Sequence, residues 1–137
     1  MPSAADQVKA PVDRIAVDTS IWLKALLFGG SAEELINLAL TGKVEILTTE
    51  TQFADLANIL SHRLKFSETS IAEVRKFIES VATIVRVATE PAAGPGDEMS
   101  TLLRAARDSQ ATAIATSDNS KLNSLEEFEG IPIVTVS

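Results

Sequence analysis

The sequence contains no cysteine and no tyrosine, and only 4% of its residues are aromatic. The absence of cysteine excludes disulfide bonds and thiolate metal sites, and it is compatible with a reducing cytoplasm. So few aromatic side chains argue against a platform on which nucleic-acid bases stack. No apolar run approaches the roughly 18 residues that a transmembrane helix needs, and residues 1–12 lack the apolar core of a signal peptide. We therefore expect a soluble, cytoplasmic protein with no membrane partner.

Positive charge is also scarce. Acidic residues outnumber basic residues by 19 to 12, which gives a net charge of −7. This balance excludes a basic surface over the whole domain, of the kind that binds nucleic acid tightly and without specificity. It does not exclude a local rim of basic residues. The surplus of carboxylates fits a site in which several of them gather around a cation.

The length of 137 residues suits one domain. We expect residues 1–12 to form a loose leader and residues 13–137 to form the domain. Apolar segments typical of buried strands (residues 14–17, 44–48, 84–88, 112–116 and 132–136) alternate with amphipathic helical segments. Ser31 and Glu34 form a capping-box pattern, which predicts a helix start after Ser31. The alternation predicts an α/β fold, with a central parallel sheet of about five strands covered by helices on both faces.

Two acidic residues follow predicted strands. Asp18 comes directly after residues 14–17, and Asp118 comes just after residues 112–116. Ligands of open parallel sheets bind at the carboxyl ends of the strands, so these two carboxylates are expected to meet although they are far apart in the sequence. Each also has a plainer interpretation. Asp18 is a good N-cap for the next helix, and Asp118 is a common turn residue.

Three further acids are candidates for the same site. Asp55 lies near the border of the buried face of a predicted helix, and Asp97 and Glu98 lie at the start of another. The plainer interpretations are a solvated helix residue for Asp55 and favourable interactions with the helix dipole for Asp97 and Glu98. If these acids converge, a cation must offset their repulsion, and oxygen-only ligands favour Mg²⁺ or Mn²⁺ over zinc. Such an ion can activate water for attack on a phosphodiester.

Two stretches of the chain resemble the PIN domain family. They are "RIAVDTSIWLKALLFGGSAEELINLALTGKVEILTTETQFADLANIL" and "ATAIATSDNSKLNSLEEFEGIPIVTVS". The chain is especially similar to the toxin components of toxin–antitoxin systems, the VapC-like nucleases. The resemblance implies a three-layer α/β/α sandwich and an endoribonuclease that uses Mg²⁺ or Mn²⁺ to hydrolyse RNA. It also implies an antitoxin protein and a second copy of the chain, paired through helices, as partners.

The resemblance assigns catalytic and metal-binding roles to three acids. The family's first acid falls on Asp18 and its fourth on Asp118. The second falls on Asp55, where the family usually has the longer glutamate. Polar residues beside these positions are expected to support the site, in part by orienting water or phosphate, and they are Thr19, Ser20, Ser100, Ser117 and Asn119.

The third acidic position of the family falls on Ser100, whose hydroxyl is a poor substitute for a carboxylate on Mg²⁺. Asp97 or Glu98 would have to supply the missing metal ligand. Two interpretations therefore stay open. One is a working ribonuclease with a rearranged acid. The other is a PIN fold that has lost catalysis and acts as a module that binds RNA or a protein.

Basic residues near these positions could form a local rim that contacts RNA phosphates. The plainer interpretation is that they are solvated side chains that balance the acidic surface. The candidates are Arg63, Lys65, Arg104, Arg107 and Lys121.

Overall fold

A computed structural model describes residues 12–86, 97–117 and 126–136 of the chain. The strands of this part are β1 (Asp13–Val17), β2 (Val44–Thr49), β3 (Ala82–Val85), β4 (Ala113–Thr116), β5 (Glu127–Phe128) and β6 (Ile131–Thr135). The helices are α2 (Thr19–Leu27), α3 (Gly30–Leu40), α4 (Glu50–His62), α5 (Glu68–Val81) and α6 (Asp97–Asp108). None of these described helices combines the length and the apolar character needed to cross a membrane.

The six strands form one sheet in the order β3-β2-β1-β4-β6-β5. All pairings are parallel except that of the short β5 with β6. β1 is central, because its Ile15 pairs with Ile46 of β2 on one side and with Ala113 of β4 on the other. The chain passes from β1 to β2 and β3, and then crosses back to β4. Open α/β sheets bind ligands at such a switch point, beyond the carboxyl ends of the strands.

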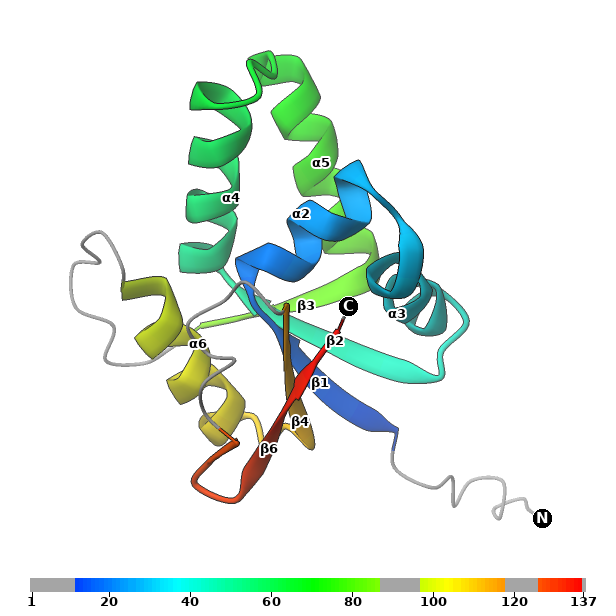
Figure 1. The fold of residues 1–137 in the computed structure, drawn as a ribbon, viewed down its shortest axis with the longest axis vertical. Coiled ribbons are helices and arrows are strands. Elements are labelled where there is room, and N and C mark those ends of the chain that lie inside the picture. Colours follow the sequence, from blue (N-terminus) through cyan, green and yellow to red (C-terminus); the bar gives the residue numbers. More distant parts are fainter. Residues whose placement is uncertain (1–11, 87–96, 118–125, 137) are drawn as a thin grey trace.

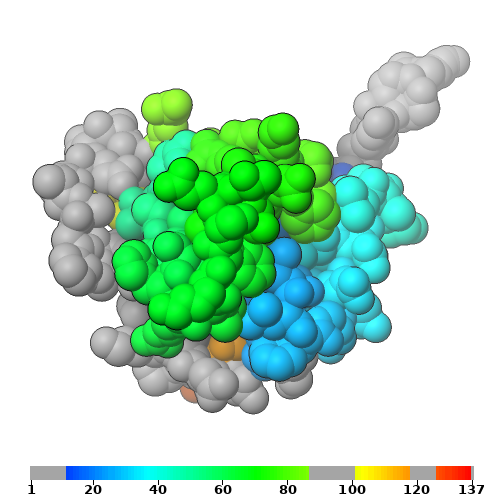
Figure 2. All heavy atoms as spheres, turned by 90° about the horizontal axis from the view of Figure 1, so that it is seen from above, coloured from blue at the N-terminus to red at the C-terminus, as the bar shows by residue number. Residues whose placement is uncertain are grey.

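Successive residues of the central strands face opposite helix layers. Ala16 and Ile114 pack against α6, whereas Val17 and Ala115 pack in a core with residues of α2, α3, α4 and α5. In Figure 1, α6 lies at the lower left of the strands, whereas α2, α4 and α5 lie above them. Viewed from above, α4 and α5 lie side by side with α2 and α3 (Figure 2). The structure is therefore the three-layer α/β/α arrangement that the sequence predicted, with strands buried on both faces.

Two predicted boundaries are wrong for local reasons. The capping box of Ser31 and Glu34 does not form, because α3 begins at Gly30 and Gly29 is its N-cap without any side-chain hydrogen bond. Gly29 has φ +74°, a conformation that glycine adopts without strain, and it lets α3 follow α2 almost directly. The third strand starts at Ala82 instead of residue 84, because Ala82 ends α5 in an extended conformation and begins β3 at once.

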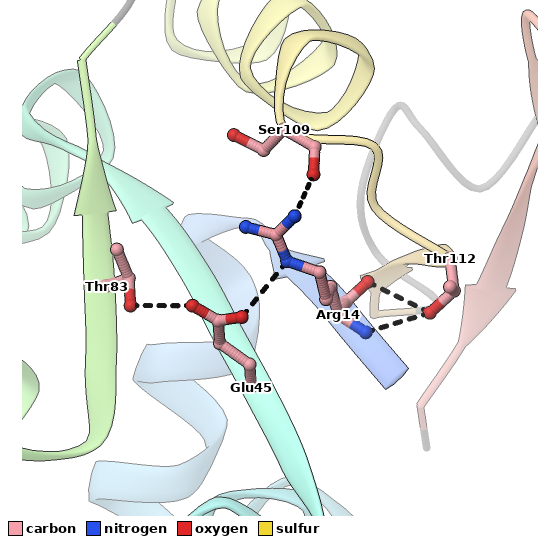
Figure 3. A network of polar contacts seen from close by, with 5 residues as sticks. All are labelled: Arg14, Glu45, Thr83, Ser109 and Thr112. Atoms are coloured by element: carbon pink, nitrogen blue, oxygen red, sulfur yellow. Dashed lines mark hydrogen bonds and ion pairs between the residues drawn. The ribbon is translucent and has the colours of Figure 1, made fainter. Parts of the chain in front are cut away.

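At the amino edge of the sheet, Arg14 connects four segments of the chain (Figure 3). Its Nε donates to Glu45 Oε1 at 3.0 Å, and its Nη1 donates to the backbone oxygen of Ser109 at 2.5 Å. Glu45 also accepts the Thr83 hydroxyl at 3.0 Å, and the backbone N–H of Arg14 donates to the Thr112 hydroxyl at 2.9 Å. Because Ser109 directly follows α6, the contact with Arg14 fixes the position of α6 along β1.

The packing of α6 on the sheet can be tested by shortening its buried Leu102. Leu102 is 0% exposed, so Leu102→Ala should lower the free energy of unfolding by about 2–5 kcal/mol through lost burial and the cavity left behind. Equilibrium urea denaturation would measure the loss. The control is Leu40→Ala at the end of α3, where the side chain is 56% exposed and the change should stay within about 0.5 kcal/mol. Equal losses for the two variants would contradict the packing of α6 described above.

Candidate functional site

Asp18 lies where β1 ends and α2 begins. Its backbone N–H donates to the backbone oxygen of Ala115 in β4 at 3.2 Å. Its Oδ1 accepts the backbone N–H of Ile21 at 3.3 Å, so the side chain is the N-cap of α2. The plainer interpretation of Asp18 as a helix cap is thus confirmed, but this cap does not account for the other contacts of the carboxylate.

Two hydroxyl groups also donate to the Asp18 carboxylate. Thr116, the last residue of β4, donates to Oδ2 at 2.5 Å, and Ser20 donates to Oδ1. The Ser20 hydroxyl in turn accepts the backbone N–H of Ser117 at 3.2 Å. Asp18 is only 7% exposed, and burying a charged group is costly unless it is hydrogen-bonded. These donors offset that cost and fix the orientation of the carboxylate at the ends of β1 and β4.

Asp55 lies on α4, one turn beyond the place where α4 meets α2. At that place the Thr19 hydroxyl approaches the backbone oxygen of Gln52 at 3.5 Å. Asp55 is three positions after Gln52 and shares its face of the helix, and its Cα–Cβ bond tilts back toward the start of α4. The Asp55 side chain is half-buried. It makes no hydrogen bond or ion pair with any residue that the structure describes.

The remaining predicted acids cannot be placed around Asp18. Among the described residues, no three histidine, aspartate or glutamate side chains form a group that could hold a metal ion. The predicted residues that lie outside the described part are Asp118, Asn119, Lys121 and the side chains of Asp97, Glu98 and Ser100.

Gln52 and Thr116 are two site residues that the sequence did not predict. Gln52 is 0% exposed, its Oε1 accepts the Thr49 hydroxyl at 2.5 Å, and its backbone N–H donates to the same hydroxyl at 3.1 Å. These contacts attach the start of α4 to the end of β2. The sequence signal for Gln52 exists, because Thr49 followed three residues later by glutamine is a capping-box pattern. Thr116 has no comparable signal, because its partner is set by the order of the strands.

The outer side of α4 is held by Arg75 of α5. Arg75 donates to both carboxylate oxygens of Glu50, at 2.7 and 2.8 Å, and to Glu79 at 2.8 Å. Its guanidinium also lies 4.9 Å from the centre of the Phe53 ring. The hydrogen bond from Arg75 lowers the pKa of the Glu50 carboxyl from its ordinary value. These contacts help to set the orientation of the helix that carries Asp55.

The basic residues that were predicted to contact RNA lie in different environments. Arg63 and Lys65 are exposed at the end of α4, a helix of 13 residues and therefore about 20 Å long, so they lie far from its start beside α2. Arg107 forms ion pairs with Asp108 at 3.1 Å and with Glu129 at 3.5 Å. Arg104 forms no ion pair within the described part of the chain, and its buried Nε has no hydrogen-bond partner there.

The donor atoms around Asp18 suit a hard divalent cation. They are the carboxylate oxygens of Asp18 and the hydroxyls of Ser20 and Thr116, all of them oxygen, in a chain without cysteine. Oδ2 accepts one hydrogen bond from a described residue, and a carboxylate oxygen has about two lone-pair sites. The carboxylate therefore keeps capacity for a cation, and the donor set fits Mg²⁺ or Mn²⁺ better than zinc.

The contact between Thr116 and Asp18 can be tested by removing one hydroxyl. Thr116→Val should lower the free energy of unfolding by about 1–3 kcal/mol, because a buried carboxylate loses a donor. Thr48→Val is a matched control, since Thr48 is a buried strand threonine whose hydroxyl has no partner among the described residues. Its stability should be unchanged or slightly higher. Urea denaturation of both variants would measure this, and equal effects would contradict the importance of the Thr116 contact.

The comparison with known families agrees with this architecture. The family model for the PIN domain matches residues 14–120, which run from β1 through β4 and include Asp18, Asp55 and Asp118. No curated protein matches the chain. PIN domains are generally nucleases, and the family generally uses divalent metals. With its mostly parallel sheet between two helix layers and a family match over most of its length, the chain belongs to the PIN domain family.

Proposed function

We propose that this protein is a metal-dependent endoribonuclease that hydrolyses RNA phosphodiester bonds. The observation that carries the proposal is the Asp18 carboxylate at the switch point of the sheet. It is 7% exposed and held by the hydroxyls of Ser20 and Thr116, with no cationic side chain paired to it within the described residues. A buried carboxylate that is oriented but not neutralised is suited to bind a cation.

The proposed roles of the acids rest on the family resemblance, and those of Thr116 and Ser20 rest on their contacts with Asp18. Asp18, Asp55 and Asp118 would hold Mg²⁺ or Mn²⁺, with Glu98 or Asp97 in place of the acid that Ser100 lacks. When bound, the ion would polarise a phosphoryl oxygen and lower the pKa of a coordinated water. Thr116 and Ser20 keep the Asp18 carboxylate in one orientation. We expect Thr19, Ser117 and Asn119 to orient water or phosphate.

The second candidate function is a PIN fold that binds RNA or a protein without cutting RNA. The serine at position 100, where the family has its third acid, is the observation that favours it. A toxin role with an antitoxin partner and the pairing of two copies of the chain are also proposals, and they rest on the family resemblance.

RNA cleavage tests the nuclease directly. Chelator-stripped protein should cut a labelled mixed-sequence RNA only after Mn²⁺ is added. Asp18→Asn should lower the rate by at least about 100-fold. Loss of a residue that only hydrogen-bonds to a metal ligand costs about 10–100-fold in metal affinity or activity, and Asp18 would itself be a metal ligand. The control Asp13→Asn removes the same charge from the exposed, opposite end of β1 and should leave the rate unchanged. All variants are purified identically to exclude a contaminating nuclease.

Metal binding gives a second measurement that does not depend on activity. Mn²⁺ that binds the folded protein raises its stability by RT ln(1 + [Mn²⁺]/Kd), so the Tm of the wild type and of Asp13→Asn should rise, and that of Asp18→Asn should not. A wild-type protein that neither cuts RNA nor gains Tm with Mn²⁺ would refute the nuclease. If this protein still binds RNA, the second candidate function is supported.

A further inference from the structure

We infer that Thr101 and Arg104 of α6 bind a phosphate group of the RNA backbone beside Asp18, an inference that rests on the proposed function. Both residues carry a buried polar atom without a partner among the described residues: the Thr101 hydroxyl, in a side chain that is 1% exposed, and the Arg104 Nε. Leaving such an atom unpaired inside a protein is costly, because the atom has lost its hydrogen bonds to water. Unpaired buried polar groups are rare in native proteins and require an explanation.

The two side chains share one flank of α6. Residues three positions apart lie on the same face of a helix, and the face that packs on the sheet is occupied by Leu102 and Ala106. Long side chains on a helix run back toward its N-terminus. We therefore expect the Arg104 guanidinium to extend toward the turn that contains Thr101.

This flank reaches the level of Asp18. α6 runs opposite to the strands, and its end is fixed to the start of β1 by the hydrogen bond from Arg14 to Ser109. From Ser109 back to Thr101 the helix advances about 12 Å, at 1.5 Å per residue. From Arg14 to Asp18 the strand advances about 13 Å, at 3.3 Å per residue. Since α6 packs directly on β1 and β2, Thr101 lies at the same edge of the sheet as the candidate metal site.

The chemistry of the two groups identifies the ligand class. An arginine N–H can only donate, and a hydroxyl can donate as well, so a ligand oxygen that accepts both bonds would satisfy both groups. Arginine binds phosphate strongly because the hydrogen bonds are assisted by charge. Arg107 on the same helix is already paired with Asp108 and Glu129, whereas Arg104 has no carboxylate partner in the described structure. A backbone phosphate held here would lie next to the phosphodiester that the metal site acts on.

RNA binding in chelator, followed by fluorescence anisotropy with a labelled mixed-sequence RNA, tests this site without cleavage. Arg104→Gln should raise the Kd about 10-fold and reduce the slope of log K against log salt by about 0.7, the value for one phosphate contact on a single strand. The matched control Arg107→Gln removes the same charge from the same helix and should change the Kd less than about two-fold, since its charge is already paired. Arg104→Lys, which keeps the charge but lacks the fork of donors, should not restore the affinity.

Thr101→Val gives an independent measurement. It should weaken RNA binding about three-fold or more while leaving the Tm unchanged or higher, because it removes a hydroxyl that has no described partner. Equal effects of Arg104→Gln and Arg107→Gln, a normal Kd for Thr101→Val, or no RNA binding by the wild type would each overturn the inference.

The test also separates this inference from the nuclease proposal. RNA that binds in an Arg104-dependent way but is never cut supports the phosphate site and refutes the nuclease. Mn²⁺-dependent cutting whose KM and kcat are unchanged in Arg104→Gln overturns the phosphate site alone.

Discussion

The hydrogen bond from the Thr116 hydroxyl to the Asp18 carboxylate is the contact on which the candidate site depends. It joins the ends of β1 and β4, which are neighbours in the sheet although the two residues are 98 positions apart. The same carboxylate caps α2 through the backbone N–H of Ile21. One side chain therefore connects the central strand pair, the start of a helix and the candidate metal site. A cation that arrives there meets a carboxylate that is already oriented.

Capping of α2 leaves lone pairs of the Asp18 carboxylate for the cation that we propose. The N–H of Ile21 and the hydroxyl of Ser20 both use Oδ1, whereas Thr116 uses Oδ2. A carboxylate has enough lone pairs for these bonds and for a cation. On the neighbouring side, the buried Gln52 attaches α4 to β2, and α4 carries Asp55. Side chains that fix the start of a helix are thus the ones that position the candidate acids.

The sequence predicted the layers, the parallel sheet and the position of Asp18, because strand and helix periodicities and the acid after β1 are local signals. It could not predict the partners of those residues. Thr116 meets Asp18 only because β4 pairs with β1, and Arg104 differs from Arg107 partly because Glu129 comes from a distant turn to pair with the latter. The start of α3 was missed because Gly29, with its positive φ, outweighed the capping box of Ser31 and Glu34.

The long separation between Asp18 and Thr116 has a consequence for how the chain acquires its site. β1, β2 and β3 follow one another in the sequence and pair in that order, together with α2, α3, α4 and α5. Because the pairing of β4 with β1 closes a long loop, we expect it to be entropically costly and to form late. A chain interrupted after β3 would leave β1 as an open sheet edge, available for pairing with other chains. During synthesis the candidate site would thus be incomplete, and the nascent protein prone to association, until β4 covers this edge.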